Sequence, residues 1–227
     1  MLLKKAGHLM MACLFVCMVT ACAPEEPPPE DVIIPRPTVI VVTAEGPYYT
    51  TFDTPGSWLV GDNTRSEGRI VDGRYVMSIR EARTLAWTHQ TRSFGPGVYE
   101  VEAEFLGGSE ASAFGILFLA SSDLSSFYYC LITADGRYDV GRCDDECTQQ
   151  ESLIGGLTLA RIILTGYQTN QLRVEYTGDQ ITFLVNGAPV GQVNGIPQGS
   201  GLVGLIGESS AFGGLDVAFD NFSITEQ

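Results

Sequence analysis

A run of alternating glutamates is the first feature of this sequence whose residue types and spacing could support chemistry. Glu100, Glu102 and Glu104 occupy every second position of GVYEVEAEF, so on a β-strand all three side chains leave one face. Retaining glycosidases work with two carboxyl groups ~5–5.5 Å apart. On a regular strand the Cα atoms of Glu100 and Glu104 are ~13 Å apart. We therefore interpret the glutamates as a solvated strand face.

Aromatic residues form a second candidate set, because sugars stack their C–H faces on exposed tryptophan and tyrosine rings. If Asp135-Gly136 is a two-residue hairpin loop, Tyr138 lies opposite Thr133 and shares a face with Tyr129. For the two tryptophans, packing in the core or at its rim is the alternative, and the one that we prefer. The ligand-binding residues expected on this basis are Tyr129, Tyr138, Trp58 and Trp87.

The N-terminus has the three parts of an export signal over residues 1–21. Lys4 and Lys5 form a positive region, residues 9–19 are almost wholly apolar, and small residues follow. The string VTAC, ending at Cys22, resembles the bacterial lipobox, which implies cleavage before Cys22 and acylation of the new terminus, palmitate included. Plain secretory cleavage after Ala23 is the alternative. The sequence thus predicts a lipoprotein held on a cell membrane and facing outside the cytoplasm.

A proline-rich tether is expected over residues 22–47, because six prolines lie between Pro24 and Pro37. Prolines favour the extended polyproline II conformation. Within this span, the β-like stretch TVIVVTA at 38–44 is either linker or a first strand. The remaining chain, residues 48–227, is expected to be a single β-domain.

Short β-branched and aromatic runs separated by glycine turns fill the chain after residue 47, and no long helical period interrupts them. The dipeptides Asp72-Gly73, Asp135-Gly136 and Asn186-Gly187 are typical of tight hairpin turns, and Gly178-Asp179 marks another. About a dozen strands without a required helix predict an all-β, antiparallel two-sheet sandwich or a barrel.

Residues 68–225 resemble the laminin-G-like, concanavalin-type jelly roll, and in particular the 3-keto-disaccharide hydrolase-like and family-66 carbohydrate-binding domains. The resemblance implies a jelly-roll sandwich. It also implies a structural Ca²⁺ between a carboxylate near the first strand and one in the last, for which Asp53 and Asp220 stand in comparable places; ordering of the terminal strand is the alternative role of Asp220. Endoglucanases of the laminarinase kind resemble this fold and carry E-x-D-x-E, but here the central residue is Glu102. The phrases that carry the resemblance are DGRYVMSI, AW, GVYEVEAEF, FGILF, FYYCLITADGRYDV, NQLRVEYTGDQITFLVNGAPVGQV, GLVGLIG and VAFDNFSI.

Three cysteines remain in the domain, and an exported protein meets oxidising conditions, so one disulfide and one spare thiol are expected. In the hairpin register above, Cys130 lies opposite Gly141, and the Cα atom of Cys143 is then ~7–8 Å away on the diagonal. That separation exceeds the usual disulfide range of ~4.4–6.8 Å. We predict a Cys143–Cys147 disulfide that closes a small acidic loop, with Cys130 as a buried free thiol.

Charge excludes one class of partner. Without residues 1–21 the chain has no lysine, and its 11 arginines and 27 acidic residues give a net charge of -16, which repels nucleic acid. His89 is then the only histidine, so a multi-histidine metal site is excluded.

We expect a carbohydrate-binding module. A structural or adhesion lipoprotein that contacts a protein is the alternative, and a glycoside-hydrolase-like enzyme is third because no acid–base constellation stands out.

Overall fold

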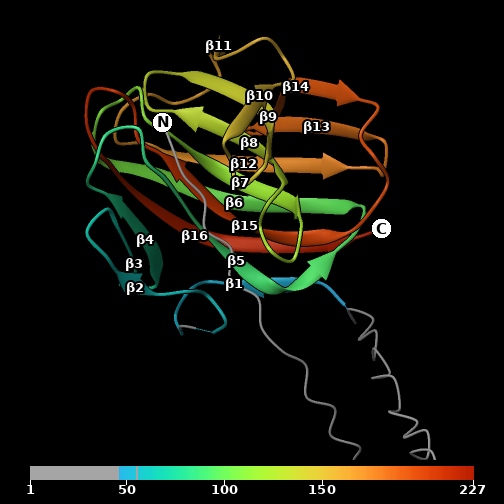
Figure 1. Cartoon of the computed structure of the whole chain (residues 1–227), viewed down its shortest axis with the longest axis horizontal. Helices are drawn as coiled ribbons and strands as arrows, with labels where there is room; N and C mark the ends of the chain where they lie inside the picture. The colour runs from blue at the N-terminus through green and yellow to red at the C-terminus, as the bar shows by residue number, and fades with distance from the viewer. Residues whose placement is uncertain (1–45, 55) are drawn as a thin grey trace, which may run out of the picture. The chain divides into compact units, whose positions relative to one another are not determined.

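A computed structural model describes residues 46–54 and 56–227, and in these residues the chain forms sixteen β-strands and no helix (Figure 1). All the strand pairings are antiparallel, so the predicted all-β, antiparallel two-sheet fold is confirmed. The predicted signal peptide, Cys22, most of the tether and the β-like stretch 38–44 lie outside the described residues. Within the described residues no helix is long and apolar enough to cross a membrane.

The larger sheet has nine strands. Its order is β14-β13-β12-β6-β16-β4-β3-β2, and β1 pairs with β16 beside this path. The strands are β1 (Tyr48–Thr50), β2 (Gly61–Asp62), β3 (Ser66–Val71), β4 (Arg74–Ile79), β6 (Gly97–Gly108), β12 (Thr169–Tyr176), β13 (Gln180–Val185), β14 (Ala188–Asn194) and β16 (Leu215–Glu226).

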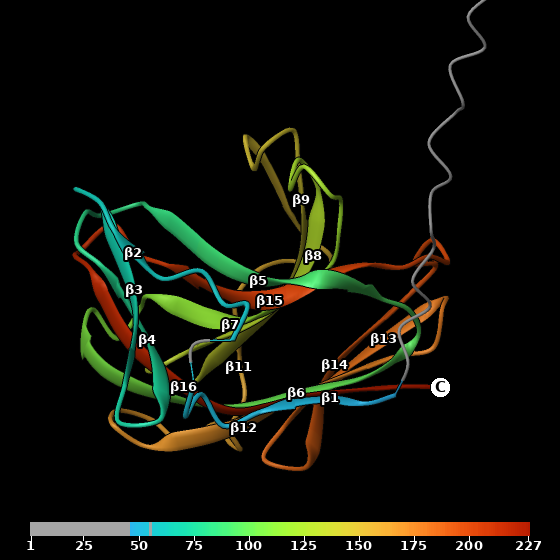
Figure 2. The same cartoon turned by 90° about the horizontal axis from the view of Figure 1, so that it is seen from below.

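The smaller sheet has seven strands in the order β10-β9-β8-β7-β15-β5, with β11 pairing with β9. Figure 2 shows the two sheets as stacked layers, with β8 and β9 rising steeply away from β5 and β15. The seven-stranded sheet is therefore strongly curled. Its strands are β5 (Leu85–Phe94), β7 (Ala113–Ala120), β8 (Phe127–Thr133), β9 (Arg137–Asp144), β10 (Gln149–Ser152), β11 (Thr158–Leu159) and β15 (Gly201–Glu208).

Alternation along the strands builds the core between the sheets. On β6 the four apolar residues that alternate with the glutamates are at most 1% exposed, whereas the glutamates between them are partly exposed. Burial of such aromatic and aliphatic side chains contributes roughly 25 cal/mol per Å² of apolar surface. The four β6 residues that face the core are Tyr99, Val101, Ala103 and Phe105.

A second apolar cluster lies on the outer face of the seven-stranded sheet, inside its curl. Leu117, Phe127, Tyr129 and Cys143 are at most 1% exposed there, although they point away from the main core. Because the sheet wraps around these side chains, its concave side is partly filled by the protein's own residues.

Most of the predicted turns are confirmed. Val71 pairs with Arg74 around Asp72-Gly73, and both turn residues have positive φ, which is the conformation that a two-residue hairpin of this kind requires. Asn186-Gly187 repeats the arrangement between β13 and β14.

The β8–β9 turn differs from prediction by one residue. Ile132, rather than Thr133, is opposite Tyr138, so the loop comprises three residues, 134–136. The Thr133 hydroxyl accepts a 3.0 Å hydrogen bond from the Arg137 N–H, and Gly136 has φ +91°, which together close the longer loop. Because side chains alternate along a strand, this shift places Tyr129 and Tyr138 on opposite faces and overturns the expectation that they share one.

The outer strands are short, interrupted or covered. β14 contains Pro189, and its register with β13 shifts between Phe183 and Leu184. β2 has two residues and β10 has four. Beside β5, the backbone N–H of Leu59 donates to the Thr88 hydroxyl at 3.1 Å, so the preceding segment lies along that edge.

Candidate functional site

Trp58 is a core residue and cannot be a sugar platform. Its side chain is 4% exposed, and its ring packs edge-on against Phe222 with the centroids 5.0 Å apart. The indole N–H donates to the Tyr48 hydroxyl at 3.1 Å. The alternative interpretation of this tryptophan, core packing, is the one that its burial supports.

The faces of the two predicted tyrosine rings are also covered. Tyr138 is 9% exposed and packs in the main core against Phe183, with ring centroids 6.4 Å apart. Tyr129 is 1% exposed and belongs to the cluster inside the curled sheet. The prediction that a sugar stacks on either ring is therefore wrong. Strand alternation buries Tyr138 in the main core, and the curl of the sheet buries Tyr129.

Trp87 is half-buried, and its ring lies 5.9 Å from that of Phe127, centroid to centroid. It lines a cavity of about 270 Å³ together with residues such as Leu59 and Asp62. Trp87 thus keeps partial access to solvent, and its role in ligand binding stays a prediction.

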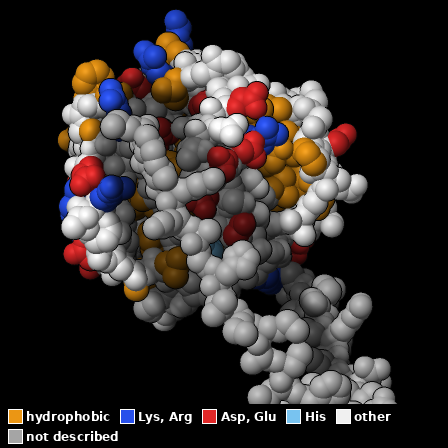
Figure 3. All heavy atoms as spheres, in the orientation of Figure 1, with side chains coloured by type: hydrophobic (Ala, Val, Ile, Leu, Met, Phe, Trp, Pro, Cys, Tyr) orange, Lys and Arg blue, Asp and Glu red, His pale blue; other side chains and the backbone are white. Residues whose placement is uncertain are grey.

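A larger cavity lies over the curled sheet. Its volume is about 310 Å³, at the small end of the range of roughly 300–1,000 Å³ typical of ligand pockets. Figure 3 views the molecule from the side on which β9 and β10 overlie other strands, and carboxylate side chains gather near the middle of that face. The cavity is lined by Ala111, Ala113, Leu131, Asp139, Gln150, Leu157, Glu208, Ser209 and Ser210.

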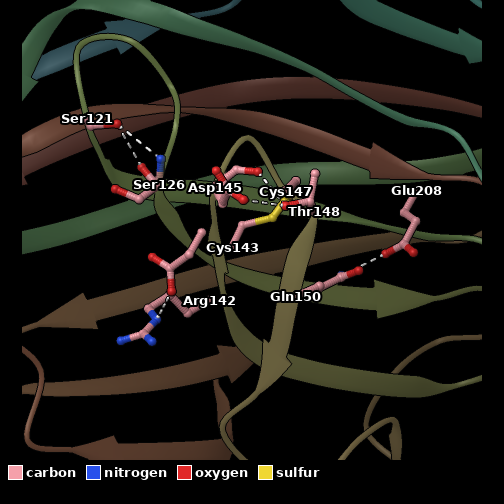
Figure 4. The surroundings of a disulfide bond; sticks show 10 residues. Ser121, Ser126, Arg142, Cys143, Asp145, Cys147, Thr148, Gln150 and Glu208 are labelled. Carbon is pink, nitrogen blue, oxygen red and sulfur yellow. Dashed lines mark hydrogen bonds and ion pairs between the residues drawn. A yellow bond between two sulfur atoms is a disulfide. The ribbon is translucent and has the colours of Figure 1, made fainter. Parts of the chain in front are cut away.

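Strand register brings the polar lining together. Asp139 on β9 pairs with Leu131, and Glu208 at the end of β15 pairs with Ala113. The Gln150 side-chain amide donates to Glu208 Oε2 at 3.1 Å (Figure 4). β10 and β15 are four positions apart in the sheet, which in a flat sheet would separate them by ~19 Å. The contact therefore depends on the curl, and Gln150 and Glu208 form a clasp across the cavity.

The Tyr129 hydroxyl lies beneath this clasp. The ring crosses Gly141, at which a Cβ atom would come 2.2 Å from Tyr129 Oη. Burial raises the pKa of Tyr129, a hydrogen bond with Gln150 opposes the rise, and the charges of Asp139 and Glu208 add to it. Both carboxylates are thus close enough to the Tyr129 hydroxyl for their charges to raise its pKa.

Asp139 is a buried carboxylate with neutral hydrogen-bond partners. The Ser152 hydroxyl donates to Asp139 Oδ1 at 2.6 Å. Burial raises the pKa of Asp139, and hydrogen bonds from Ser152, the Val140 N–H and Tyr129 partly offset that rise. A carboxyl group in this setting binds either a proton or a ligand donor more readily than an exposed one does.

Phe212 is a candidate that the sequence reasoning missed. It is 87% exposed and lies in the loop that begins with the cavity residues Ser209 and Ser210. Its backbone N–H donates to the Ser210 hydroxyl at 3.1 Å. The sequence contained one signal for an exposed ring here, which is an aromatic residue inside the serine- and glycine-rich string SSAFGG. Such a string is typical of a surface loop, in which a ring does not pack into the core.

The disulfide joins Cys143 and Cys147, with Cα atoms 4.8 Å apart, and this is the predicted pairing (Figure 4). Cys130 is a buried free thiol whose pKa burial raises well above its usual range. Cys130 pairs with Val140 in the ladder, so it and Cys143 face opposite sides of the sheet. A Cys130–Cys143 bridge is therefore excluded because the two side chains point to opposite faces of the sheet, which is a stronger reason than the diagonal distance between their Cα atoms.

The glutamates of β6 link strands of the nine-stranded sheet. Glu100 pairs with Arg173 at 3.0 Å, and Glu104 pairs with Arg74 at 2.6 Å. Glu102 accepts a 2.9 Å hydrogen bond from the Asn221 side chain. These contacts engage all three side chains on the partly exposed face of β6.

The two carboxylates expected to hold Ca²⁺ have local partners. Asp53 accepts a hydrogen bond from the Thr51 hydroxyl, and Asp220 accepts one of 2.7 Å from the Asn221 N–H. Residues 46–54 and 56–227 contain no group of three or more His, Cys, Asp or Glu side chains placed to hold a metal. A Ca²⁺ ion shared by Asp53 and Asp220 stays a prediction.

Comparison with known proteins supports the fold. No protein-family model matches the sequence, and no curated protein matches it either. Among solved structures, the carbohydrate-binding module CBM66 from Bacillus subtilis is 14% identical, with a TM-score of 0.56, over 78% of this chain and 95% of that one. A Bacillus licheniformis β-glucanase is 10% identical, with a TM-score of 0.58, over 82% of this chain and 100% of its own. A Bacillus subtilis protein of unknown function with a galectin-like fold is 11% identical, with a TM-score of 0.54, over 79% of this chain and 94% of that one. The chain thus has the concanavalin-like jelly-roll β-sandwich fold.

Proposed function

We propose that this protein is a membrane-anchored lipoprotein outside the cytoplasm, whose β-sandwich binds carbohydrate in the cavity of the curled sheet. The single observation that carries the proposal is the convergence of Asp139, Gln150 and Glu208 on one 310 Å³ cavity. Carboxylate oxygens accept hydrogen bonds from sugar hydroxyls, and an amide both donates and accepts them.

Apolar contacts complete the chemistry that a sugar ring requires. Leu157 lines the cavity and is 47% exposed, and Leu131 contributes to the lining beside Asp139. Phe212 offers an exposed ring in the adjoining loop, to which sugar C–H groups can stack. The names of similar folds, a carbohydrate-binding module and a β-glucanase, agree with this proposal at the level of fold.

The test is a glycan array probed with the chain from residue 47 onward, with and without Ca²⁺, followed by titration of each hit. Variants Glu208→Gln and Phe212→Ala should weaken binding at least tenfold, because each removes a contact to the sugar. Asp216→Asn, which removes an exposed carboxylate from β16, is the matched control and should bind like the parent. The absence of any glycan hit, or equal affinity in all variants, would argue against the cavity as a sugar site.

A glycoside-hydrolase activity is a second candidate, favoured by one observation. Two carboxylates from different strands share the cavity, and burial raises the pKa of one of them, Asp139. Pairs of carboxyl groups in contrasting environments divide the roles of acid and base in glycosidases. Prolonged incubation with each bound glycan should release shorter products if this is correct, and Asp139→Asn should abolish the release.

A further inference from the structure

Among the residues that the structure describes, the cavity has negatively charged groups in its lining and no positive one. Asp139 and Glu208 line it, and none of its lining residues is Lys, Arg or His. Residues 46–227 contain no lysine. The charged side chains in the described lining of the cavity are therefore two carboxylates.

Neither cavity carboxylate has a cationic partner within the described part of the chain. The ion pairs of residues 46–54 and 56–227 include neither Asp139 nor Glu208. Ser152 donates to Asp139, and Gln150 donates to Glu208, and both donors are neutral.

The arginines of β9 are already compensated. Arg142 pairs with Asp144 at 2.7 Å, and Arg137 pairs with Asp135 at 3.5 Å. Elsewhere in the sandwich, Glu100 and Glu104 each have an arginine within 3.0 Å. The protein thus places arginines beside strand-face carboxylates and leaves the carboxylates of the cavity without one. A carboxylate as buried as Asp139 is unfavourable without a cation, so a positively charged ligand group would be stabilised there.

We propose, as a refinement that rests on the proposed carbohydrate function, that the cavity selects glycans bearing a free amino group, such as unacetylated glucosamine units, over neutral or acidic ones. The ligand's ammonium group donates to Glu208 and Asp139 on opposite walls. Gln150 gives up its bond to Glu208, and its amide oxygen then accepts from the same ammonium or a neighbouring hydroxyl. An N-acetyl group removes the charge, and a uronate places a like charge against both carboxylates.

The experiment uses four trisaccharide probes of similar size and the full-length protein in a detergent without a sugar headgroup. The probes are β-1,4-linked glucosamine, N-acetylglucosamine, glucose and glucuronic acid trimers, titrated calorimetrically at about pH 6.5, where an amine next to electron-withdrawing groups is protonated. We expect the glucosamine trimer to bind about tenfold or more tightly than the two neutral trimers, because a charge-assisted hydrogen bond replaces a neutral one. The glucuronic acid trimer should bind most weakly.

Matched variants separate this site from general attraction of a cation to an acidic protein. Glu208→Gln and Asp139→Asn should each weaken binding of the glucosamine trimer more than binding of the neutral trimers, and so lose the preference for glucosamine. Asp216→Asn should keep the preference. Thermal unfolding of each variant confirms that it folds. A glucosamine preference that survives in Glu208→Gln and Asp139→Asn, or falls equally in Asp216→Asn, overturns the inference.

Failure of the inference can be distinguished from failure of the proposed function. Equal affinity for glucosamine, N-acetylglucosamine and glucose trimers, weakened by Glu208→Gln, would overturn the amine selectivity and leave a carbohydrate site. Stronger binding of the glucuronic acid trimer would also overturn it. If no glycan on the array or among these probes binds, the proposed function itself fails.

Discussion

Gly141 determines where the side chain of Tyr129 can lie. A Cβ atom at this position would come 2.2 Å from Tyr129 Oη and 2.6 Å from the Glu151 carbonyl oxygen, and both neighbours are held in the sheet. Gly141→Ala should therefore destabilise the fold by about 1–3 kcal/mol through overpacking and displace the hydroxyl from beneath the cavity. Urea unfolding together with glycan titration measures both effects.

Gly199→Ala is the matched control for that change. A Cβ atom at Gly199 meets nothing within 4 Å, and its φ is not in the left-handed region. Its free energy of unfolding should stay within about 0.5 kcal/mol of the parent's. Equal effects of the two substitutions would mean that the ring of Tyr129 moves aside without cost.

Asp139 should make stability depend on pH in an unusual direction. Its pKa is raised by burial in the folded protein, so between the ordinary value of ~3.9 and the raised one the folded state binds more protons than the unfolded state. Stability contributed by the protonated group is present below pH ~4 and is lost as the pH rises through the folded pKa. Asp139→Asn keeps an oxygen to accept from Ser152 and should remove this loss.

Urea midpoints of the parent and Asp139→Asn, measured from about pH 3 to 7, test that expectation. The variant's stability relative to the parent should increase with pH and level off above the raised pKa. A difference that is constant across the range would show that the charge of Asp139 does not contribute.

At the scale of elements, the disulfide fixes the turn from which β10 starts. Asp145, Glu146 and Cys147 all have positive φ, which non-glycine residues adopt at a cost. The Glu146 N–H donates to the Ser125 carbonyl at 3.0 Å, which ties this turn to the β7–β8 loop. The same short strand carries Gln150, so the turn holds one half of the clasp in place.

Cys147→Ser should therefore loosen β10 and leave the sandwich intact. A ring this small contributes only about 2 kcal/mol through chain entropy. Hydrogen exchange should accelerate at residues 149–152, while β6 and β16 keep their protection, and glycan affinity should fall with the loss of the clasp. Uniformly faster exchange in every strand would contradict a local role.

Much of the element pattern was readable from the sequence, and the site was not. The alternation of β6 and the turns at Asp72-Gly73 and Asn186-Gly187 are local properties, so the residues themselves indicated them. The Asp135-Gly136 turn was misjudged because the Thr133 hydroxyl closes a loop one residue longer. Gln150 and Glu208 are 58 residues apart, and they meet only because the sheet curls, which strand patterns do not encode.

At the scale of the whole molecule, the proposed anchor at Cys22 makes a prediction about the processed chain. Mass spectrometry of the membrane fraction should find an N-terminal, acylated Cys22, since several acyl chains together give stable attachment. Cys22→Ser should leave the protein unprocessed or release it from the membrane. An unmodified N-terminus at Pro24 would mean secretory cleavage after Ala23 instead.

The outer strands of the sandwich have a consequence for how copies of this protein behave when crowded. An open strand edge is a template to which another chain can add a strand, and this is a common route to aggregation. Here Pro189 and a register shift interrupt β14, two edge strands are very short, and the segment at Leu59 lies along β5. Within residues 46–54 and 56–227, copies packed densely side by side therefore find no continuous edge to extend. The fold should remain monodisperse at concentrations at which sandwiches with open edges form fibrils.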